Sequence, residues 1–208
     1  DRASKIVFYL GNIIVNGHND VSGRVSNNST VEVQIPISNT KSEKNNYVKD
    51  LQTLGPEKFA KKIKETPYTL ITDTTMRDAH QSLLATRMRT DDLINIAEYY
   101  SENLSNLFSL ECWGGATFDT SMRFLKEDPW DRLARLNKKA PNLLKQMLFR
   151  GSNAVGYKNY PDNVVKHFIQ QSAEAGIDVF RVFDSLNLID NMRVAIDEVR
   201  NQNKICEG

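Results

Sequence analysis

After Tyr68 the sequence repeats one pattern four times: a short apolar run, a polar loop and an amphipathic helix. The predicted strands are Leu70–Thr72, Phe108–Cys112, Gln146–Phe149 and Val179–Phe183. The predicted helices are Asp91–Ser101, Trp130–Lys139, Asn163–Ala175 and Asn191–Arg200. Strands that alternate with helices pair in parallel, through right-handed crossovers. The pattern therefore predicts an α/β fold built on a parallel sheet.

Four such units fit either an open doubly wound sheet or half of a (β/α)8 barrel. No GxGxxG motif follows the first predicted strand, so a dinucleotide-binding open sheet loses support. Polar or aromatic residues instead follow every strand: Asp78 and Gln81, Trp113 to Gly115, Arg150 and Gly151, and Asp184 and Ser185. Barrel enzymes place their chemistry at the ends of several strands. We therefore favour the first half of a TIM (β/α)8 barrel.

The length of the repeating region agrees with half a barrel. A complete barrel needs about 250 residues, whereas 141 residues run from Tyr68 to Gly208. We expect the chain to stop near the fourth strand–helix unit of a longer polypeptide.

Residues 1–66 have a different character and are predicted to be a small mixed linker segment before the half barrel of residues 67–208. The run KIVFYLGNIIVNG, with its Asn16-Gly17 turn signal, is predicted to be β-rich. The polar stretch Asn19–Lys49 is typical of a loose surface connection. Gly55-Pro56-Glu57 opens a short basic helix, EKFAKKIKE, whose lysines we assign to a solvated face.

Composition excludes several classes of function. The net charge is +1, which gives no electrostatic reason to expect nucleic acid or an anionic membrane as a partner. The sequence has no apolar run of 18 residues and therefore no predicted transmembrane helix. The two cysteines, Cys112 and Cys206, lack CxxC spacing, so we expect reduced thiols in a reducing compartment.

Four long motifs identify a resemblance. TDTTMRDAHQSLLATRMRT, SLECWGGATFDTSMRFLKEDPW, LFRGSNAVGYKNYPDNVV and GIDVFRVFDSLN resemble, in this order, the carboxyltransferase domain of biotin-dependent pyruvate carboxylases. The preceding DRASKIVFYLGNIIVNG and LGPEKFAKKIKE resemble the linker and allosteric region of the same enzymes. Transcarboxylase and the oxaloacetate decarboxylase alpha subunit share the RDAHQS element, but their barrels lie near the chain start.

The resemblance implies a site. Asp78 would be a ligand of a divalent metal such as zinc or manganese, and Arg77 would help to orient it. Gln81 would hydrogen-bond pyruvate, and Arg150 would contact the substrate and the biotin pocket. Two further residues, Asp119 and Tyr157, would line that pocket. Arg2, in a shorter match, would contact the activator acetyl-CoA.

The resemblance also implies what lies outside residues 1–208. The remaining metal ligands, a carboxylated lysine and two histidines, and a proton-shuttling threonine would come from later strands. ATP and Mg would bind a separate biotin carboxylase domain, and biotin would arrive on a carrier domain. The parent enzyme would be a homotetrameric ligase that makes oxaloacetate, cytoplasmic or, in a eukaryote, in the mitochondrial matrix. The chain by itself is expected to be inactive.

Structural roles compete with these assignments. Judged by the residues alone, Asp78 is a capping or turn carboxylate. We assign Asp73 and His80 to support of the strand end, and Cys112 to the core. Three hypotheses stay open: a pyruvate carboxylase segment, a related decarboxylase or transcarboxylase subunit, and a non-catalytic half-barrel module.

Overall fold

The structure is a computed structural model that describes residues 2–18 and 46–208. Two compact units make up the chain, Asp1–Ser38 and Asn39–Gly208. The polar stretch Asn19–Lys49 lies outside the described residues except for its last four positions. Among the described residues, no helix is long and apolar enough to cross a membrane.

The described part of the first unit is a helix, α1 (Arg2–Asn16), so the predicted β-rich run is wrong. Ile6, Leu10 and Ile13 recur at intervals of four and three residues, which matches a helical face and not the alternation of a strand. Gly17 does not form a hairpin turn: its φ is 76° and its N–H donates to the carbonyl of Ile13 at 2.8 Å, which ends the helix.

The second unit contains a five-stranded parallel sheet in the order β1-β2-β3-β4-β5, which confirms the predicted α/β class. The strands are β1 (Thr72–Asp73), β2 (Ser109–Trp113), β3 (Leu144–Phe149), β4 (Val179–Val182) and β5 (Ile205–Glu207). An open doubly wound sheet reverses its strand order at a switch point. The uninterrupted sequential order is that of a barrel wall. Four strands were predicted, and β5 was missed because it is only three half-buried residues long.

Helices follow each of the first four strands, and the four predicted ones are confirmed to within two residues at each end. They are α4 (Thr90–Asn103), α6 (Pro129–Lys139), α7 (Asp162–Glu174) and α8 (Ile189–Asn201). Shorter turns occupy the loops: η2 (Thr75–Ala79), α3 (His80–Leu84), α5 (Gly115–Thr120), η3 (Ser121–Leu125) and η4 (Gly151–Asn153). The larger core lies between these helices and one face of the sheet, through residues such as Leu110, Met147 and Phe180.

Helix α2 (Tyr47–Lys64) starts before the basic segment predicted to be a helix and is kinked inside it. The Asn46 side chain caps its first turn by accepting from the backbone N–H of Lys49 at 2.9 Å. Gly55, with φ 73°, breaks the helix, and Pro56 restarts it at a first-turn position where proline needs no N–H partner.

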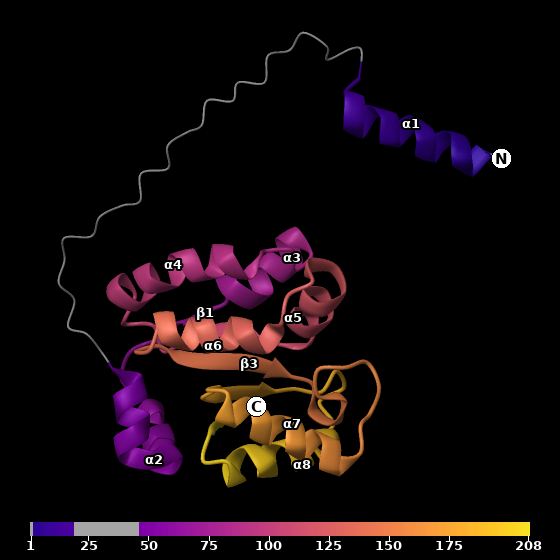
Figure 1. The fold of residues 1–208 in the computed structure, drawn as a ribbon. Helices are drawn as coiled ribbons and strands as arrows, with labels where there is room; N and C mark the ends of the chain where they lie inside the picture. The colour runs from indigo at the N-terminus through magenta and orange to yellow at the C-terminus, as the bar shows by residue number, and fades with distance from the viewer. Residues whose placement is uncertain (1, 19–45) are drawn as a thin grey trace. The chain divides into compact units, whose positions relative to one another are not determined.

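Helix α2 packs over the amino-terminal ends of the strands (Figure 1). Its Phe59 is fully buried and stacks on Phe108, just before β2, with ring centroids 6.3 Å apart. The same cluster holds Leu144 and Val179, the first residues of β3 and β4. Residues 46–64 are therefore part of the sheet's own compact unit, although the predicted domain boundary after residue 66 refers to the family's domains and stays a prediction.

Candidate functional site

The predicted site residues follow the carboxyl ends of the first three strands. Arg77 and Asp78 lie in η2 after β1, Asp119 in α5 after β2, and Arg150 and Tyr157 at and after the end of β3. Parallel pairing puts these strand ends on one edge of the sheet. In barrel folds this edge is the face that carries the chemistry.

Arg77 and Asp78 form an ion pair in the turn that follows β1, the first strand of the sheet. Arg77 Nη1 donates to Asp78 Oδ1 at 2.9 Å, and the side chains are 7% and 52% exposed, respectively. The pair lies in a π-helical turn, in which the N–H of Ala79 reaches the carbonyl of Thr74 at 3.1 Å. Such turns are frequent at functional sites. The arginine is thus buried beneath a carboxylate that remains open to a ligand.

Glu111, in the middle of β2, holds Arg77 from the other side. Arg77 Nε donates to Glu111 Oε1 at 2.6 Å, and Nη2 makes a second, shorter bond to the same oxygen. The Glu111 side chain is fully buried. Sequence reasoning missed this residue, although an acidic side chain in the buried run Phe108–Cys112 was a visible signal. Glu111 therefore occupies the Nε–Nη2 edge of the guanidinium, while Nη1 bonds to Asp78.

Gln81, His80 and Asp73 are the other polar residues considered at the end of β1 and in the loop after it. Gln81 is half-buried in α3, three residues after Asp78 and about one helical turn away. His80 is buried, its Nε2 lies 2.9 Å from the carbonyl of Met76, and desolvation lowers its pKa. The carboxylate of Asp73 accepts the N–H and hydroxyl of Thr75 at 3.0 and 3.1 Å. These local contacts agree with a supporting role for Asp73 and His80, which stays a prediction.

Arg150 and Tyr157 lie together on the loop after β3. The Arg150 guanidinium carbon is 5.1 Å from the centroid of the Tyr157 ring, within cation–π range. Arg150 Nη1 also donates to the carbonyl of Gly156 at 3.2 Å. The Tyr157 side chain is 70% exposed, so its hydroxyl is available to a ligand. Ala154, at φ 49° and ψ −113°, holds this loop in a conformation that is costly for a residue with a Cβ.

Asp119 lies in α5, whose first residue packs against the loop after β3. A Cβ at Gly115, the first residue of α5, would lie 2.7 Å from the carbonyl oxygen of Val155. The two backbones therefore touch where α5 begins. The Asp119 carboxylate pairs with Arg123 at 3.1 Å and is 31% exposed. Arg2 is the first residue of α1, and its side chain lies outside the described ones.

A divalent metal would find one predicted ligand here. Among residues 2–18 and 46–208, no group of three or more His, Cys, Asp or Glu side chains could hold a metal ion. Asp78 presents a partly exposed carboxylate with Oδ2 outside the Arg77 bond, a hard oxygen donor that suits zinc or manganese. Its donor chemistry therefore fits one ligand position of a metal site, and the other ligands would have to come from residues outside this group.

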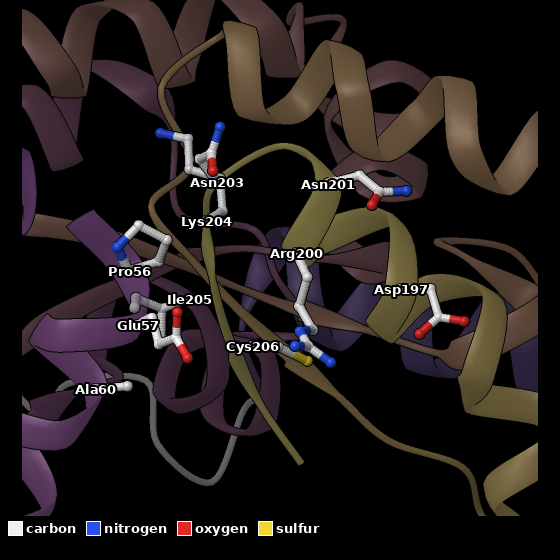
Figure 2. Close-up of a pocket in the computed structure, with 10 residues that line it drawn as sticks. All are labelled: Pro56, Glu57, Ala60, Asp197, Arg200, Asn201, Asn203, Lys204, Ile205 and Cys206. Carbon is white, nitrogen blue, oxygen red and sulfur yellow. The ribbon is translucent and has the colours of Figure 1, made fainter.

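A cavity of about 600 Å³ lies elsewhere, between α2, α8 and β5 (Figure 2). The residues that line it are Pro56, Glu57, Ala60, Asp197, Arg200, Asn201, Asn203, Lys204, Ile205 and Cys206. Burial raises the pKa of the Cys206 thiol to about 11, despite the nearby Arg200. The cavity reaches the amino-terminal end of β5, opposite the edge with the predicted residues, so we do not assign the candidate site to it.

Comparison with known proteins shows similarity along the whole chain, although no family model matches it. Pyruvate carboxylase of Staphylococcus aureus is 52% identical over 209 residues, which cover 100% of this chain and 18% of that protein. Human mitochondrial pyruvate carboxylase is 47% identical over 208 residues, with the same two shares. The resemblance found in the sequence is confirmed, and the chain spans less than a fifth of the length of these relatives.

Solved structures agree with the sequence relatives. The carboxyltransferase domain of Rhizobium etli pyruvate carboxylase with oxamate and biotin matches with a TM-score of 0.79 and 55% identity, over 100% of this chain and 35% of that chain. A variant of the Rhizobium etli enzyme with the allosteric activator acetyl coenzyme A matches with a TM-score of 0.78 and 54% identity, over 100% of this chain and 18% of that chain. The fold described above is therefore that of part of a carboxyltransferase domain.

Proposed function

We propose that this chain is a segment of a biotin-dependent pyruvate carboxylase that carries the first half of the carboxyltransferase barrel. In the whole enzyme, this barrel would move a carboxyl group from carboxybiotin to pyruvate and give oxaloacetate. One observation carries the proposal: the similarity to pyruvate carboxylases runs through all of the chain, including residues 1–66 before the barrel. The decarboxylase and transcarboxylase alternatives do not account for that upstream match.

Carboxyl transfer to pyruvate requires residues of the types found at the carboxyl ends of the strands. The methyl carbon of pyruvate must lose a proton, which leaves an enolate with negative charge on the former keto oxygen. A divalent metal held in part by Asp78 would stabilise that charge as a Lewis acid. Buried Arg77 would keep the Asp78 carboxylate in place through the 2.9 Å contact. Gln81, a helical turn away, would donate a hydrogen bond to the bound pyruvate.

Residues after β2 and β3 would contact the substrate carboxylate and biotin. Arg150 offers a planar, permanently charged fork that suits a carboxylate. Tyr157 and Asp119 supply a hydroxyl and an acceptor for the polar edge of the biotin ring, which would otherwise be desolvated without partners. The exposure of the Tyr157 ring and its contact with Arg150 support this assignment.

Other properties follow for the parent enzyme and not for this segment alone. We expect a ligase that uses ATP and Mg in a separate domain, works as a homotetramer and responds to acetyl-CoA, with Arg2 as one contact. We expect the isolated chain to be inactive, because Asp78 alone cannot hold a metal. The human relative is described as mitochondrial, and we expect a matrix location in a eukaryote or a cytoplasmic one in a bacterium.

The test is the activity of the longer protein that contains this chain. The purified protein is given pyruvate, bicarbonate and ATP, and oxaloacetate is followed by its reduction with malate dehydrogenase. Oxaloacetate should form only with all three substrates and should stop when avidin captures biotin. A protein that decarboxylates oxaloacetate without ATP would establish the decarboxylase alternative, and one with neither activity would favour the non-catalytic module.

A further inference from the structure

A continuous chain of polar side chains crosses the face of the sheet opposite to the helices. It contains one or two residues from every strand: Thr72, Ser109, Glu111, Gln146, Arg181 and Glu207. Helices cover the other face, through residues of opposite alternation such as Leu110 and Phe180. The network therefore lies on the face that turns away from the helices, and its Glu111 contacts Arg77 of the Arg77–Asp78 pair.

Each link of the network has hydrogen-bond or ion-pair length. Ser109 Oγ lies 2.8 Å from Thr72 Oγ1 and donates to Gln146 Oε1 at 2.5 Å. Gln146 Nε2 donates to Glu207 Oε2 at 3.1 Å. Arg181 Nε donates to Glu207 Oε1 at 2.9 Å. Five strands thus hold one another in register through side chains as well as through the backbone.

Glu111 is the point at which this network reaches the candidate site. One carboxylate oxygen, Oε1, accepts both bonds from Arg77. The other oxygen, Oε2, lies 2.9 Å from Arg181 Nη1 as an ion pair without a hydrogen bond. A fully buried carboxylate is tolerated only when cations or donors face it. Two guanidinium groups, from η2 and from β4, meet that requirement.

The arrangement constrains Arg77 more than a single partner would. With Nε and Nη2 both held by Glu111, the guanidinium plane is fixed, and Nη1 is directed to Asp78. A long arginine side chain without such an anchor has considerable rotamer freedom to lose. The alternating charges of Asp78, Arg77, Glu111, Arg181 and Glu207 therefore form one connected series from the exposed carboxylate to the last strand.

We propose that Glu111 is a positioning residue for the carboxyltransferase reaction: it orients Arg77, and through Arg77 the Asp78 carboxylate, while Arg181 and Glu207 hold Glu111 in place. This proposal rests on the proposed function. Glu111 touches neither substrate nor metal in it. Its effect reaches the site only through Arg77, and that dependence can be measured.

The experiment uses the longer protein with Glu111→Gln, which keeps the shape of the side chain and removes its charge. We expect the kcat for oxaloacetate formation and the metal bound after purification to fall at least about tenfold, as for other residues that orient metal ligands. Bicarbonate-dependent ATP cleavage, which the proposed parent enzyme performs in another domain, should stay at the wild-type rate and show that the loss is confined to the carboxyltransferase step. Unchanged kcat and metal content would overturn the proposal.

A double-mutant cycle separates positioning from a general structural role. In an Arg77→Met background, Glu111→Gln should lower kcat by less than about twofold further, because its route to the site is already lost. Full additivity of the two losses would contradict the proposal. If Glu111→Gln does not fold, Glu207→Gln decides, since its side chain is 42% exposed. It should lower kcat a few-fold, and wild-type kcat would overturn the proposal.

Failure of the proposed function gives a different result from failure of this inference. A wild-type protein that binds metal but forms no oxaloacetate would refute the proposed function, and the metal content of Glu111→Gln would still test the role of Glu111. A wild-type protein that forms oxaloacetate, with Glu111→Gln equal to it in kcat and metal content, would refute the inference alone.

Discussion

Arg150 lies over the ring of Tyr157, with its guanidinium carbon 5.1 Å from the ring centroid. The two residues come from one loop, yet the proposed function gives them different partners, a substrate carboxylate and biotin. Their contact implies that a change in Tyr157 has two separable consequences, one through the lost hydroxyl and one through the lost ring.

Tyr157→Phe and Tyr157→Ala should separate these consequences in the longer protein. Phenylalanine keeps the ring under Arg150 but removes a hydrogen bond of about 1 kcal/mol, so we expect oxaloacetate formation to slow about fivefold. Alanine also removes a cation–π contact of about 0.5–1 kcal/mol and should be slower still. Steady-state kcat is the measurement. A Phe variant with the wild-type rate would show that the hydroxyl does not meet biotin.

Gly115→Ala should lower stability by pushing the start of α5 away from the loop after β3. The new Cβ would lie 2.7 Å from the backbone oxygen of Val155, which cannot swing aside as a side chain would. We expect a loss of about 1–3 kcal/mol in the free energy of unfolding. Gly114→Ala is the matched control, because its Cβ would meet nothing closer than 3.5 Å and its backbone is extended. Urea unfolding followed by fluorescence compares the two, and equal stabilities would contradict the packing described.

Phe59→Ala tests whether α2 is part of the sheet's compact unit. Phe59 is fully buried against Phe108, so its truncation should cost about 3–5 kcal/mol of unfolding free energy. Lys58→Ala, on the exposed side of the same helix, should change it by less than about 0.5 kcal/mol. The fluorescence of Trp113 and Trp130, the two tryptophans of the chain, reports unfolding of this unit. A Phe59 variant as stable as the Lys58 variant would mean that α2 is a detachable linker.

Cys112 makes stability depend on alkaline pH. Burial raises the pKa of its thiol from 9.0 to about 12. Above pH 9 the unfolded thiol loses its proton and the folded one keeps it, so unfolding becomes easier as pH rises toward 12. The contribution is about 1.4 kcal/mol per pH unit. Cys112→Ala should flatten the measured slope by about 1 kcal/mol per pH unit between pH 9 and 10.5, where the unfolded thiol is still titrating, whereas Leu110→Val should leave it unchanged.

The periodic elements were predictable because each needs only local information. The helices α4, α6, α7 and α8 show apolar residues at helical spacing, and β2 to β4 are short apolar runs. Prediction fails where two signals compete or the element is very short. The apolar residues of α1 have helical spacing, but its β-branched content and the Asn16-Gly17 pair favour a β-rich run, and the three residues of β5 carry no pattern.

The candidate site was predictable only in part, for a different reason. Asp78, Gln81 and Arg150 follow strands, so their placement on one edge follows from a parallel sheet. Glu111 and Arg77 are 34 residues apart, and only the register of β1 and β2 brings them together. A charged residue inside a predicted buried strand is a visible signal in the sequence. It indicates which residue needs a partner but not which residue the partner is.

The metal content of Asp78→Ala in the longer protein tests the central claim most directly. Elemental analysis of the purified wild type, Asp78→Ala and the exposed control Asp92→Ala should be done beside the oxaloacetate assay. We predict that Asp78→Ala loses more than about 90% of both bound divalent metal and kcat, because a ligand is removed outright, and that Asp92→Ala keeps both. Full metal content and wild-type kcat in Asp78→Ala would contradict the account.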